Sequence, residues 1–206
     1  MSHTITTVLL IRHAQTDAVG AWHAGRAGEL SLNQCGRAQA ARLCERLGRV
    51  NLSAVYSSPL PRAVETAGPV ARDRGLRVEP MLELVEVDFG EWTGARFEDL
   101  ASDPRWTRFN QNRSTAEVPG GERATEVQAR IARALDVARE RHPNQTVAFV
   151  SHADVIRYAV LHIVGAPLDF VHRFEISPAS ITSVALHADG ATLLYVNERD
   201  PLSNGL

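Results

Sequence analysis

The chain has 206 residues, of which 44% are hydrophobic and 22% charged, values that are typical of one globular domain with a sizeable core. Its formal net charge of −2 argues against non-specific binding to nucleic acid or to an anionic membrane, so any anion site has to be built locally. All 22 basic residues are arginine, and the absence of lysine excludes the Walker A phosphate loop and Schiff-base chemistry.

Predicted strands and helices alternate through the first part of the chain. Apolar β-branched residues predict a strand over 6–11, and a stretch rich in Ala, Gln, Arg and Leu predicts a helix over 32–47. The next pair is a strand over 54–58 and a helix over 61–74 that a proline opens. A short strand is predicted over 76–80.

Residues 83–121 form the longest stretch without a regular pattern. Its residues include helix-breaking types and three of the larger aromatic side chains of the chain: Gly90, Gly94, Pro104, Trp92, Trp106 and Phe109. Stretches of this length are usually functional lids or contain short helices of their own. We therefore expect 83–121 to be a lid or inserted region.

The remaining chain returns to regular patterns. The strongest helical pattern covers 121–142, with an apolar stripe made of Val127, Ile131, Leu135 and Ala138. A strand over 146–150, a helix over 154–165 and a hairpin over 180–198 that turns at Asp189 and Gly190 follow it.

These elements predict an α/β fold with three layers, in which helices flank a mostly parallel sheet and the C-terminal hairpin adds an antiparallel edge. We expect a single domain over residues 1–206. Because ligands bind at the carboxyl ends of strands in such sheets, polar residues that directly follow a strand are the best candidates for a site.

The sequence has neither a signal-peptide pattern nor a run of roughly 20 apolar residues, so we expect a cytoplasmic protein. Cys35 and Cys44 lie on opposite faces of one predicted helix, which prevents them from bridging each other. Their spacing is not of a metal-binding type. We expect no metal and no cofactor.

Three predicted strands end in unusual polar residues. "LLIRHAQTD" supplies Arg12 and His13, "VYSSPLPRAVET" supplies Arg62, and "AFVSHADVIR" supplies His152. A single histidine after a buried strand is more often a hydrogen-bonded structural residue than a catalyst. In this chain two of the eight histidines follow buried strands, each beside a turn, and this favours a shared functional site.

These segments resemble the motifs of the histidine phosphatase superfamily, the phosphoglycerate mutase-like proteins. "LLIRHAQTD" is similar to the Arg-His-Gly signature, and five further matches follow in the family's order: "ELSLNQCGRAQAARL", "VYSSPLPRAVETA", "ELVEVDFGEWTG", "PGGERATEVQAR" and "VSHADVIR". The resemblance implies an acid or broad-specificity phosphomonoester hydrolase that needs no metal and forms a phosphohistidine.

The chemistry of phosphoryl transfer explains why these residue types occur together. The reaction needs an in-line nucleophile and positive charge on the phosphoryl oxygens. Arg12 and Arg62 can bind phosphate through fork-like hydrogen bonds, and their charge would keep His13 neutral and nucleophilic. By the resemblance, His152 donates to a phosphate oxygen, and Glu86 protonates the leaving group and then acts as base toward water.

The proton donor has competitors among its neighbours. Glu83, Asp88 and Glu91 lie close to Glu86 in the sequence, but only Glu86 holds the register of the family motif. The alternative interpretation is that these four acids form a solvated loop face.

Further contacts with phosphate are expected near the two histidines. Backbone amides near Ala14 and Ala153 can bind an anion, and Thr16 can donate its hydroxyl or cap a turn. Ser57 and Ser58 are assigned to hydrogen bonding near the phosphate or within a turn, because no Gly-x-Ser-x-Gly elbow surrounds them.

The walls of the substrate pocket are less defined by the sequence. Trp22 and His23 are candidates, together with aromatic side chains of 83–121. Four arginines could meet a second anionic group or form a solvated face: Arg26, Arg105, Arg108 and Arg113.

The chain departs from the family pattern at a few positions. Ala14 and Ala153 stand where glycines usually follow the two histidines, and Arg123 replaces a common serine. A methyl group impedes close backbone approach only slightly unless the position needs a positive φ. Residues 17–19 occupy the region in which many relatives carry an asparagine.

Three other functions stay open at this stage. A cofactor-dependent phosphoglycerate mutase is disfavoured by the short chain and the missing lysine. A metallohydrolase would use His13, His152 and Glu86 as ligands, against repulsion from the two arginines. A non-catalytic phosphate-binding module is the third. We expect a small phosphorylated substrate, a monomer or homodimer, and neither nucleic acid nor membrane as partner.

Overall fold

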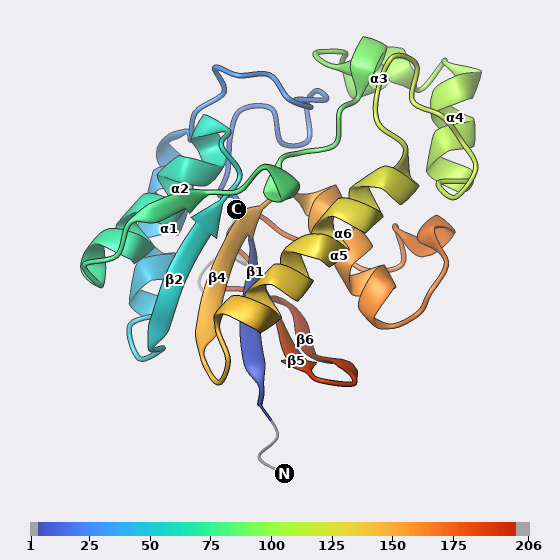
Figure 1. Ribbon diagram of the computed structural model, residues 1–206. Coiled ribbons are helices and arrows are strands. Elements are labelled where there is room, and N and C mark those ends of the chain that lie inside the picture. Colours follow the sequence, from blue (N-terminus) through green and yellow to red (C-terminus); the bar gives the residue numbers. More distant parts are fainter. Residues whose placement is uncertain (1–3, 201–206) are drawn as a thin grey trace.

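A computed structural model describes residues 4–200, which fold into a six-stranded sheet between two layers of helices (Figure 1). The strand order is β3-β2-β4-β1-β5-β6. The strands are β1 (Thr6–Arg12), β2 (Leu52–Ser57), β3 (Val78–Pro80), β4 (Thr146–Ser151), β5 (Ile181–His187) and β6 (Gly190–Glu198). The first four are mutually parallel, and β5 and β6 form the antiparallel edge. The predicted three-layer α/β fold is confirmed.

Each face of the sheet is covered by a pair of helices (Figure 1). The first pair is α1 (Gln34–Arg46) and α2 (Pro61–Asp73), and the second pair is α5 (Ala124–Arg141) and α6 (Ala153–Ile163). Both helices of the second pair, like those of the first, lie next to each other in space. The predicted stripe of α5 is buried in the core: Val127, Ile131, Leu135 and Ala138.

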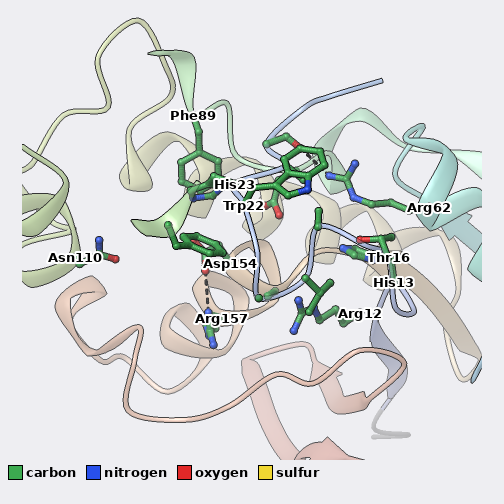
Figure 2. A pocket seen from close by; sticks show the side chains of 18 of the residues that line it. Arg12, His13, Thr16, Trp22, His23, Arg62, Phe89, Asn110, Asp154 and Arg157 are labelled. Atoms are coloured by element: carbon green, nitrogen blue, oxygen red, sulfur yellow. Dashed lines mark hydrogen bonds and ion pairs between the residues drawn. The ribbon is translucent and has the colours of Figure 1, made fainter. Parts of the chain in front are cut away.

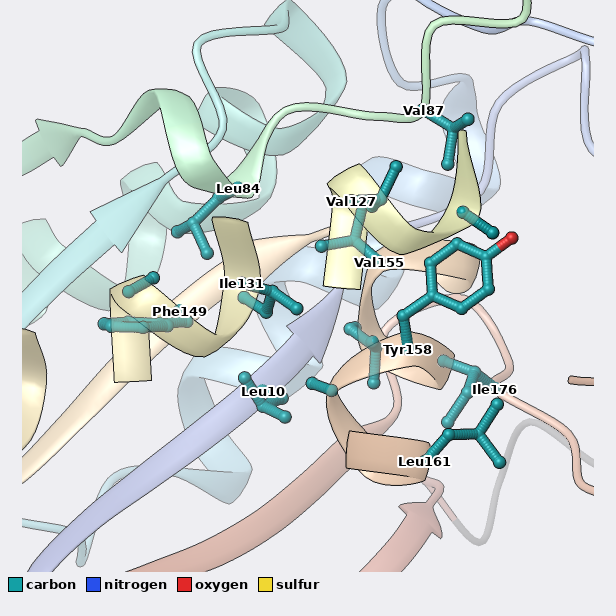
Figure 3. Close-up of a cluster of buried hydrophobic side chains, with 14 of the residues drawn as sticks. Leu10, Leu84, Val87, Val127, Ile131, Phe149, Val155, Tyr158, Leu161 and Ile176 are labelled. Carbon is teal, nitrogen blue, oxygen red and sulfur yellow. The ribbon is translucent and has the colours of Figure 1, made fainter. Parts of the chain in front are cut away.

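Alternating side chains of β1 divide between two hydrophobic clusters. Val8 and Leu10 belong to the cluster that α5 and α6 complete, in which Leu10 lies near Ile131 and Phe149 (Figure 3). Leu9 and Ile11 belong to the other cluster, under α1 and α2. Because successive side chains of a strand point to opposite faces, an uninterrupted apolar run is what a doubly covered strand requires.

Residues 82–121 contain short helices of their own. They are η1 (Leu82–Leu84), η2 (Gly90–Trp92), α3 (Phe97–Leu100) and α4 (Pro104–Gln111), and a further short helix, η3 (Leu168–Phe170), follows α6. The α3 and α4 helices lie beyond the end of the sheet toward which β1, β2 and β4 point (Figure 1). Trp92 and Phe109 are buried with their ring centroids 5.3 Å apart. Both belong to the hydrophobic cluster that β1, α5 and α6 share, so these two aromatic side chains fix the segment to the domain.

The C-terminal hairpin turns one residue earlier than predicted. Ala188 and Asp189 form the turn, and Gly190 already pairs with His187 as the first residue of β6. Gly190 has a φ of 154°, a conformation that favours glycine, so the residue starts the strand rather than ending the turn. Cys35 and Cys44 are both free. Among residues 4–200, no helix is long and apolar enough to span a membrane.

Candidate active site

The carboxyl ends of β1, β2 and β4 bring the candidate residues together. In the parallel pair of β1 and β4, Arg12 lies opposite Ser151, so the two histidines follow at equivalent positions. The rings of His13 and His152 have centroids 5.2 Å apart. Arg62 lies in the first turn of α2, which follows β2. The register of three neighbouring strands thus places two arginines and two histidines at one edge of the sheet.

These residues open into a cavity of about 250 Å³ (Figure 2). Candidates from the sequence that line it include Arg12, His13, Thr16, Trp22, His23, Arg62, Glu86 and Ala153. His152 is fully buried behind them, next to His13. Phe89, Phe97 and Trp106 complete an aromatic wall with Trp22 and His23. Burial lowers the pKa of His23 to about 4, so this wall is uncharged at neutral pH.

The geometry of His13 leaves one ring nitrogen free to attack. The side chain is only 6% exposed, and its Nδ1 lies 2.8 Å from the carbonyl oxygen of Ala14. A carbonyl can only accept, so Nδ1 carries the proton and Nε2 keeps its lone pair. Burial, reinforced by the charges of Arg12 and Arg62, holds the pKa of His13 well below its usual range. His13 is therefore a neutral imidazole at pH 7.

Two arginines flank His13 and are held by backbone carbonyls. Arg12 donates from Nη1 to the oxygen of Ile176 at 2.6 Å, and Arg62 donates from Nη2 to the oxygen of Gly25 at 2.7 Å. Burial lowers the pKa of both guanidinium groups. Both stay cationic at neutral pH, because arginine starts from a pKa above 12.

Several buried polar atoms around His13 have no hydrogen-bond partner among the described residues. They are Nε of Arg12, Nε of Arg62, Oγ1 of Thr16 and Nδ1 of His152. A buried donor without a partner costs about 1–3 kcal/mol, so such a group of atoms favours a ligand that accepts hydrogen bonds. The amide of Ala14 does not belong to this group, contrary to expectation, because it donates to Thr66 Oγ1 at 3.0 Å.

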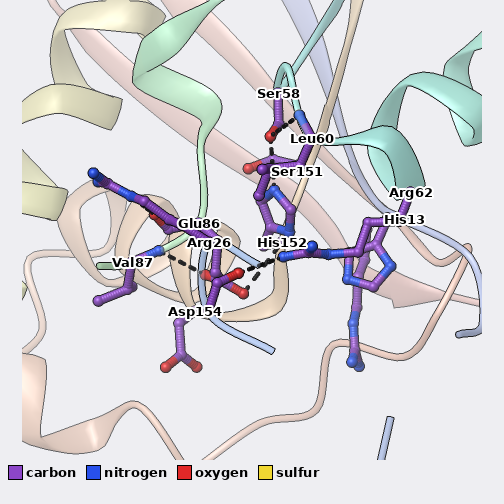
Figure 4. A network of polar contacts seen from close by, with 12 residues as sticks. His13, Arg26, Ser58, Leu60, Arg62, Glu86, Val87, Ser151, His152 and Asp154 are labelled. Carbon is purple, nitrogen blue, oxygen red and sulfur yellow. Dashed lines mark hydrogen bonds and ion pairs between the residues drawn. The ribbon is translucent and has the colours of Figure 1, made fainter. Parts of the chain in front are cut away.

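Glu86 is the one acid of its segment that lines the cavity. Its Oε1 accepts from the Val87 amide at 2.9 Å, and its Oε2 lies 3.8 Å from Nδ1 of His152 (Figure 4). Burial and then the nearby charge of Asp154 raise the pKa of Glu86 to about 7. A carboxyl group with this pKa can release and take up a proton at neutral pH.

The three competing acids of the segment have other surroundings. Asp88 pairs with Arg26 at 3.6 Å, and Glu91 pairs with Arg105 at 3.2 Å. The backbone oxygen of Glu83 accepts from Arg130. None of them is among the residues that line the cavity.

The backbone around Glu86 is held from both sides by arginines. Arg26 donates to the backbone oxygen of Glu86 at 2.9 Å and Arg130 donates to that of Glu83 at 2.5 Å. Glu122 binds both guanidinium groups at 2.9 Å. Glu122 of the "GGE" segment thus holds the two arginines that bind the backbone around Glu86, a structural role that the sequence did not reveal.

Close backbone approach explains the glycine that precedes Glu122. A Cβ on Gly121 would lie 2.3 Å from the oxygen of Asp88, and a Cβ on Gly90, whose φ is 46°, would lie 2.1 Å from the oxygen of Pro119. Only glycine fits such contacts, so these two positions bring the segment that follows Glu86 and the "GGE" segment together.

The sequence analysis missed the polar residues at the far side of the cavity, among them Asn110, Asp154, Arg157 and His172. Asp154 binds Arg157 and Arg113, each at 3.0 Å. The spacing of Asp154 and Arg157, three residues apart directly after His152, could have indicated a pair on one helix face. Of the four arginines considered for a second anionic group, only Arg113 lines the cavity: Arg26, Arg105 and Arg108 do not.

The two alanines that replace the family's glycines fit without strain. The non-glycine residues with positive φ in the described part of the chain are Asn144, Ala179 and Asn197, so neither Ala14 nor Ala153 needs a left-handed backbone. Ala153 begins α6 and lines the cavity. Across residues 4–200, no three His, Cys, Asp or Glu side chains are arranged to hold a metal ion.

Residues 8–199 match the model of the histidine phosphatase superfamily, branch 1. A bifunctional protein of Mycobacterium tuberculosis is 34% identical over 191 residues, which are 92% of this chain and 52% of the relative; the chain thus spans about half of that protein. Phosphoserine phosphatase 1 of Hydrogenobacter thermophilus is 30% identical over 196 residues, covering 92% of this chain and 91% of the relative. The solved structure of Bacillus stearothermophilus YhfR superposes with a TM-score of 0.89 at 28% identity, covering 95% of this chain and 98% of YhfR.

Proposed function

The chain belongs to branch 1 of the histidine phosphatase superfamily, and we propose that it hydrolyses small phosphomonoesters through a phosphohistidine on His13. The observation that carries the proposal is the set of unpartnered polar atoms around a neutral His13, which lines the cavity and whose Nε2 carries no proton. The phosphatase named above among its relatives supports hydrolysis over transfer to a second hydroxyl.

The first step makes the phosphoenzyme. The phosphate dianion accepts from Arg12, Arg62 and Thr16, which neutralises charge and orients the phosphorus toward His13. Nε2 of His13 attacks, the bond between phosphorus and the ester oxygen breaks, and that oxygen takes the proton of Glu86. The pKa of about 7 supports this role, since an appreciable fraction of Glu86 is protonated at neutral pH.

The second step regenerates the enzyme. Glu86, now ionised, takes a proton from water, and the resulting oxygen attacks phosphorus. The bond from phosphorus to Nε2 breaks, and the electron pair returns to His13 as phosphate leaves. Because His13 stays neutral between turnovers, the nucleophile needs no further proton transfer before the next substrate binds.

The substrate is a small phosphomonoester, and we place the segment 83–121 as the lid over its leaving group. Trp22, His23 and Trp106 offer flat, uncharged surfaces to the leaving group, which supports broad specificity. A screen of sugar phosphates, phosphoglycerates, nucleotides and phosphoamino acids tests this point, with mutase activity assayed in parallel.

The experiment that tests the mechanism is trapping of labelled phosphate. We expect an acid-labile, base-stable phosphoryl group on His13 after rapid quenching with a ³²P-labelled substrate, and unchanged activity in EDTA. His13→Ala should abolish both label and turnover. A metal requirement, or a His13→Ala variant as active as the parent, would refute the proposed function.

A further inference from the structure

Ser58 and His152 form a buried pair directly behind the phosphate site. Ser58 follows β2 and His152 follows β4, and both side chains are inaccessible to solvent. Oγ of Ser58 lies 2.8 Å from Nε2 of His152, and the same Oγ accepts from the amide of Leu60 at 3.3 Å (Figure 4). The steps proposed above assign no role to this serine.

The hydrogen bonds of Ser58 determine where His152 carries its proton. A serine hydroxyl has one proton to donate, and the Leu60 amide, itself a donor, cannot receive it. In the part of the chain that the structure describes, the acceptor in contact with Ser58 Oγ is Nε2 of His152. Burial, followed by the charge of Arg62, keeps His152 neutral by holding its pKa well below its usual range. A neutral imidazole that accepts at Nε2 must carry its proton on Nδ1.

The opposite tautomer is disfavoured at both ends of the ring. If Nε2 donated to Ser58, the hydroxyl proton would be buried without an acceptor, at a cost of about 1–3 kcal/mol. Nδ1 would then present a lone pair toward Oε2 of Glu86, 3.8 Å away. That lone pair would repel the phosphate oxygens and attract the proton of Glu86.

We propose that Ser58 is a positioning residue whose hydroxyl fixes His152 as the Nδ1-protonated tautomer. In this form the imidazole donates to a phosphate oxygen and cannot remove the proton that Glu86 delivers to the leaving group. The catalytic consequence rests on the proposed function, whereas the tautomer is a property of the resting protein.

The loss of this hydroxyl should depend on the leaving group. An alkoxide needs the proton of Glu86, whereas p-nitrophenolate leaves without one. Once Ser58 no longer donates to Nε2, His152 populates both tautomers, and the Nε2-protonated form competes for the Glu86 proton. Hydrolysis of alkyl phosphates should therefore suffer more than hydrolysis of p-nitrophenyl phosphate.

Ser57 provides a matched control for this test. Its side chain is as buried as that of Ser58, but its hydroxyl donates to the backbone oxygen of Ser58 at 2.8 Å rather than to His152. Ser57→Ala and Ser58→Ala each remove one buried hydroxyl, and the two positions are adjacent in the chain. A general loss of packing would affect both variants, whereas a tautomer effect belongs to Ser58→Ala alone.

The experiment combines ¹⁵N NMR of histidine-labelled resting enzyme with kinetics on the two kinds of ester. We expect a protonated Nδ1 at His152 in the parent and in Ser57→Ala, and a mixture of tautomers in Ser58→Ala. For an alkyl phosphate, kcat/KM of Ser58→Ala should fall about 10- to 100-fold, and the loss for p-nitrophenyl phosphate should be several times smaller.

Two results would overturn the inference. One is an Nε2-protonated His152 in the parent enzyme, which needs no variant to be observed. The other is a Ser58→Ala variant that matches Ser57→Ala on both esters. Absence of labelled phosphate on His13 in the parent would instead refute the proposed function and leave the tautomer measurement intact.

Discussion

Replacing Glu86 by glutamine separates the two steps of the proposed reaction. The amide keeps the size of the side chain but can neither deliver nor take up a proton. At pH 7 a carboxyl group with a pKa of about 7 is about half protonated, whereas one at the ordinary value of 4.5 would be about 0.3% protonated. Burial, together with the charge of Asp154, therefore raises the amount of acid form about 150-fold. We expect kcat/KM for an alkyl phosphate to fall about 10²- to 10⁴-fold, the range of general acid catalysis.

The assay compares an alkyl phosphate with p-nitrophenyl phosphate under rapid quenching. With p-nitrophenyl phosphate, the leaving group needs no proton, so Glu86→Gln should still form the phosphohistidine. Water attack then lacks its base, and we expect a burst of about one p-nitrophenol per active site followed by slow turnover. With the alkyl phosphate we expect no burst, because the first step itself is slow.

Glu91→Gln is the control for this experiment, since Glu91 is exposed, pairs with Arg105 and lies outside the cavity. It should behave as the parent enzyme on both esters. Equal losses on both esters without a burst, or parental activity of Glu86→Gln, would refute the assignment of Glu86 as proton donor.

Three further predictions concern stability and the neighbours of Glu86. Because the pKa of Glu86 is raised in the folded state, its ionisation destabilises the fold as pH rises from about 4.5 to 7. Glu86→Gln removes this cost, so in urea titrations it should raise the free energy of unfolding by about 1–3 kcal/mol at pH 8 and by much less at pH 5. Asp154→Asn removes a negative charge that raises the pKa of Glu86. For an alkyl phosphate, we therefore expect the alkaline limb of the kcat/KM profile to move to lower pH. An unmoved limb would contradict the cause given for that pKa. Arg62→Lys should weaken orthovanadate binding about 10- to 100-fold in calorimetry, because one ammonium cannot contact both Gly25 and the anion, and parental affinity would count against the fork-like contact.

The sheet and the residues at its edge were predictable because they depend on local patterns. The apolar run of β1 predicts a doubly covered strand, and a parallel sheet places its carboxyl ends at one edge. Arg12, His13 and His152 occupy the ends of adjacent strands for this reason. These placements follow from periodicity and strand order alone, without any knowledge of side-chain packing.

The far side of the cavity was not predictable in the same way. Arg113, two residues beyond the end of α4, lines the cavity and binds Asp154, whereas Arg105, in the same segment, binds Asp103 and Glu91 outside it. Nothing in the local sequence distinguishes these two arginines, since their positions depend on how the segment 83–121 packs on the domain. The Ala14 amide was misassigned for a similar reason: its partner, Thr66, comes from a distant helix.

Two hydrogen bonds from Arg62 to the loop after β1 give its guanidinium group a structural role in addition to its charge. Nη2 donates to the oxygen of Gly25 at 2.7 Å and Nη1 to that of Ala27 at 3.4 Å, while Nε has no partner among the described residues. The same loop pairs with the segment 83–121 through His23, whose amide donates to the oxygen of Ala95 at 2.8 Å. One guanidinium with five N–H groups can hold this loop and still bind phosphate. In the proposed mechanism, the residue that binds the anion therefore also fixes the wall against which the leaving group lies, and the single nitrogen of a lysine could not span both places.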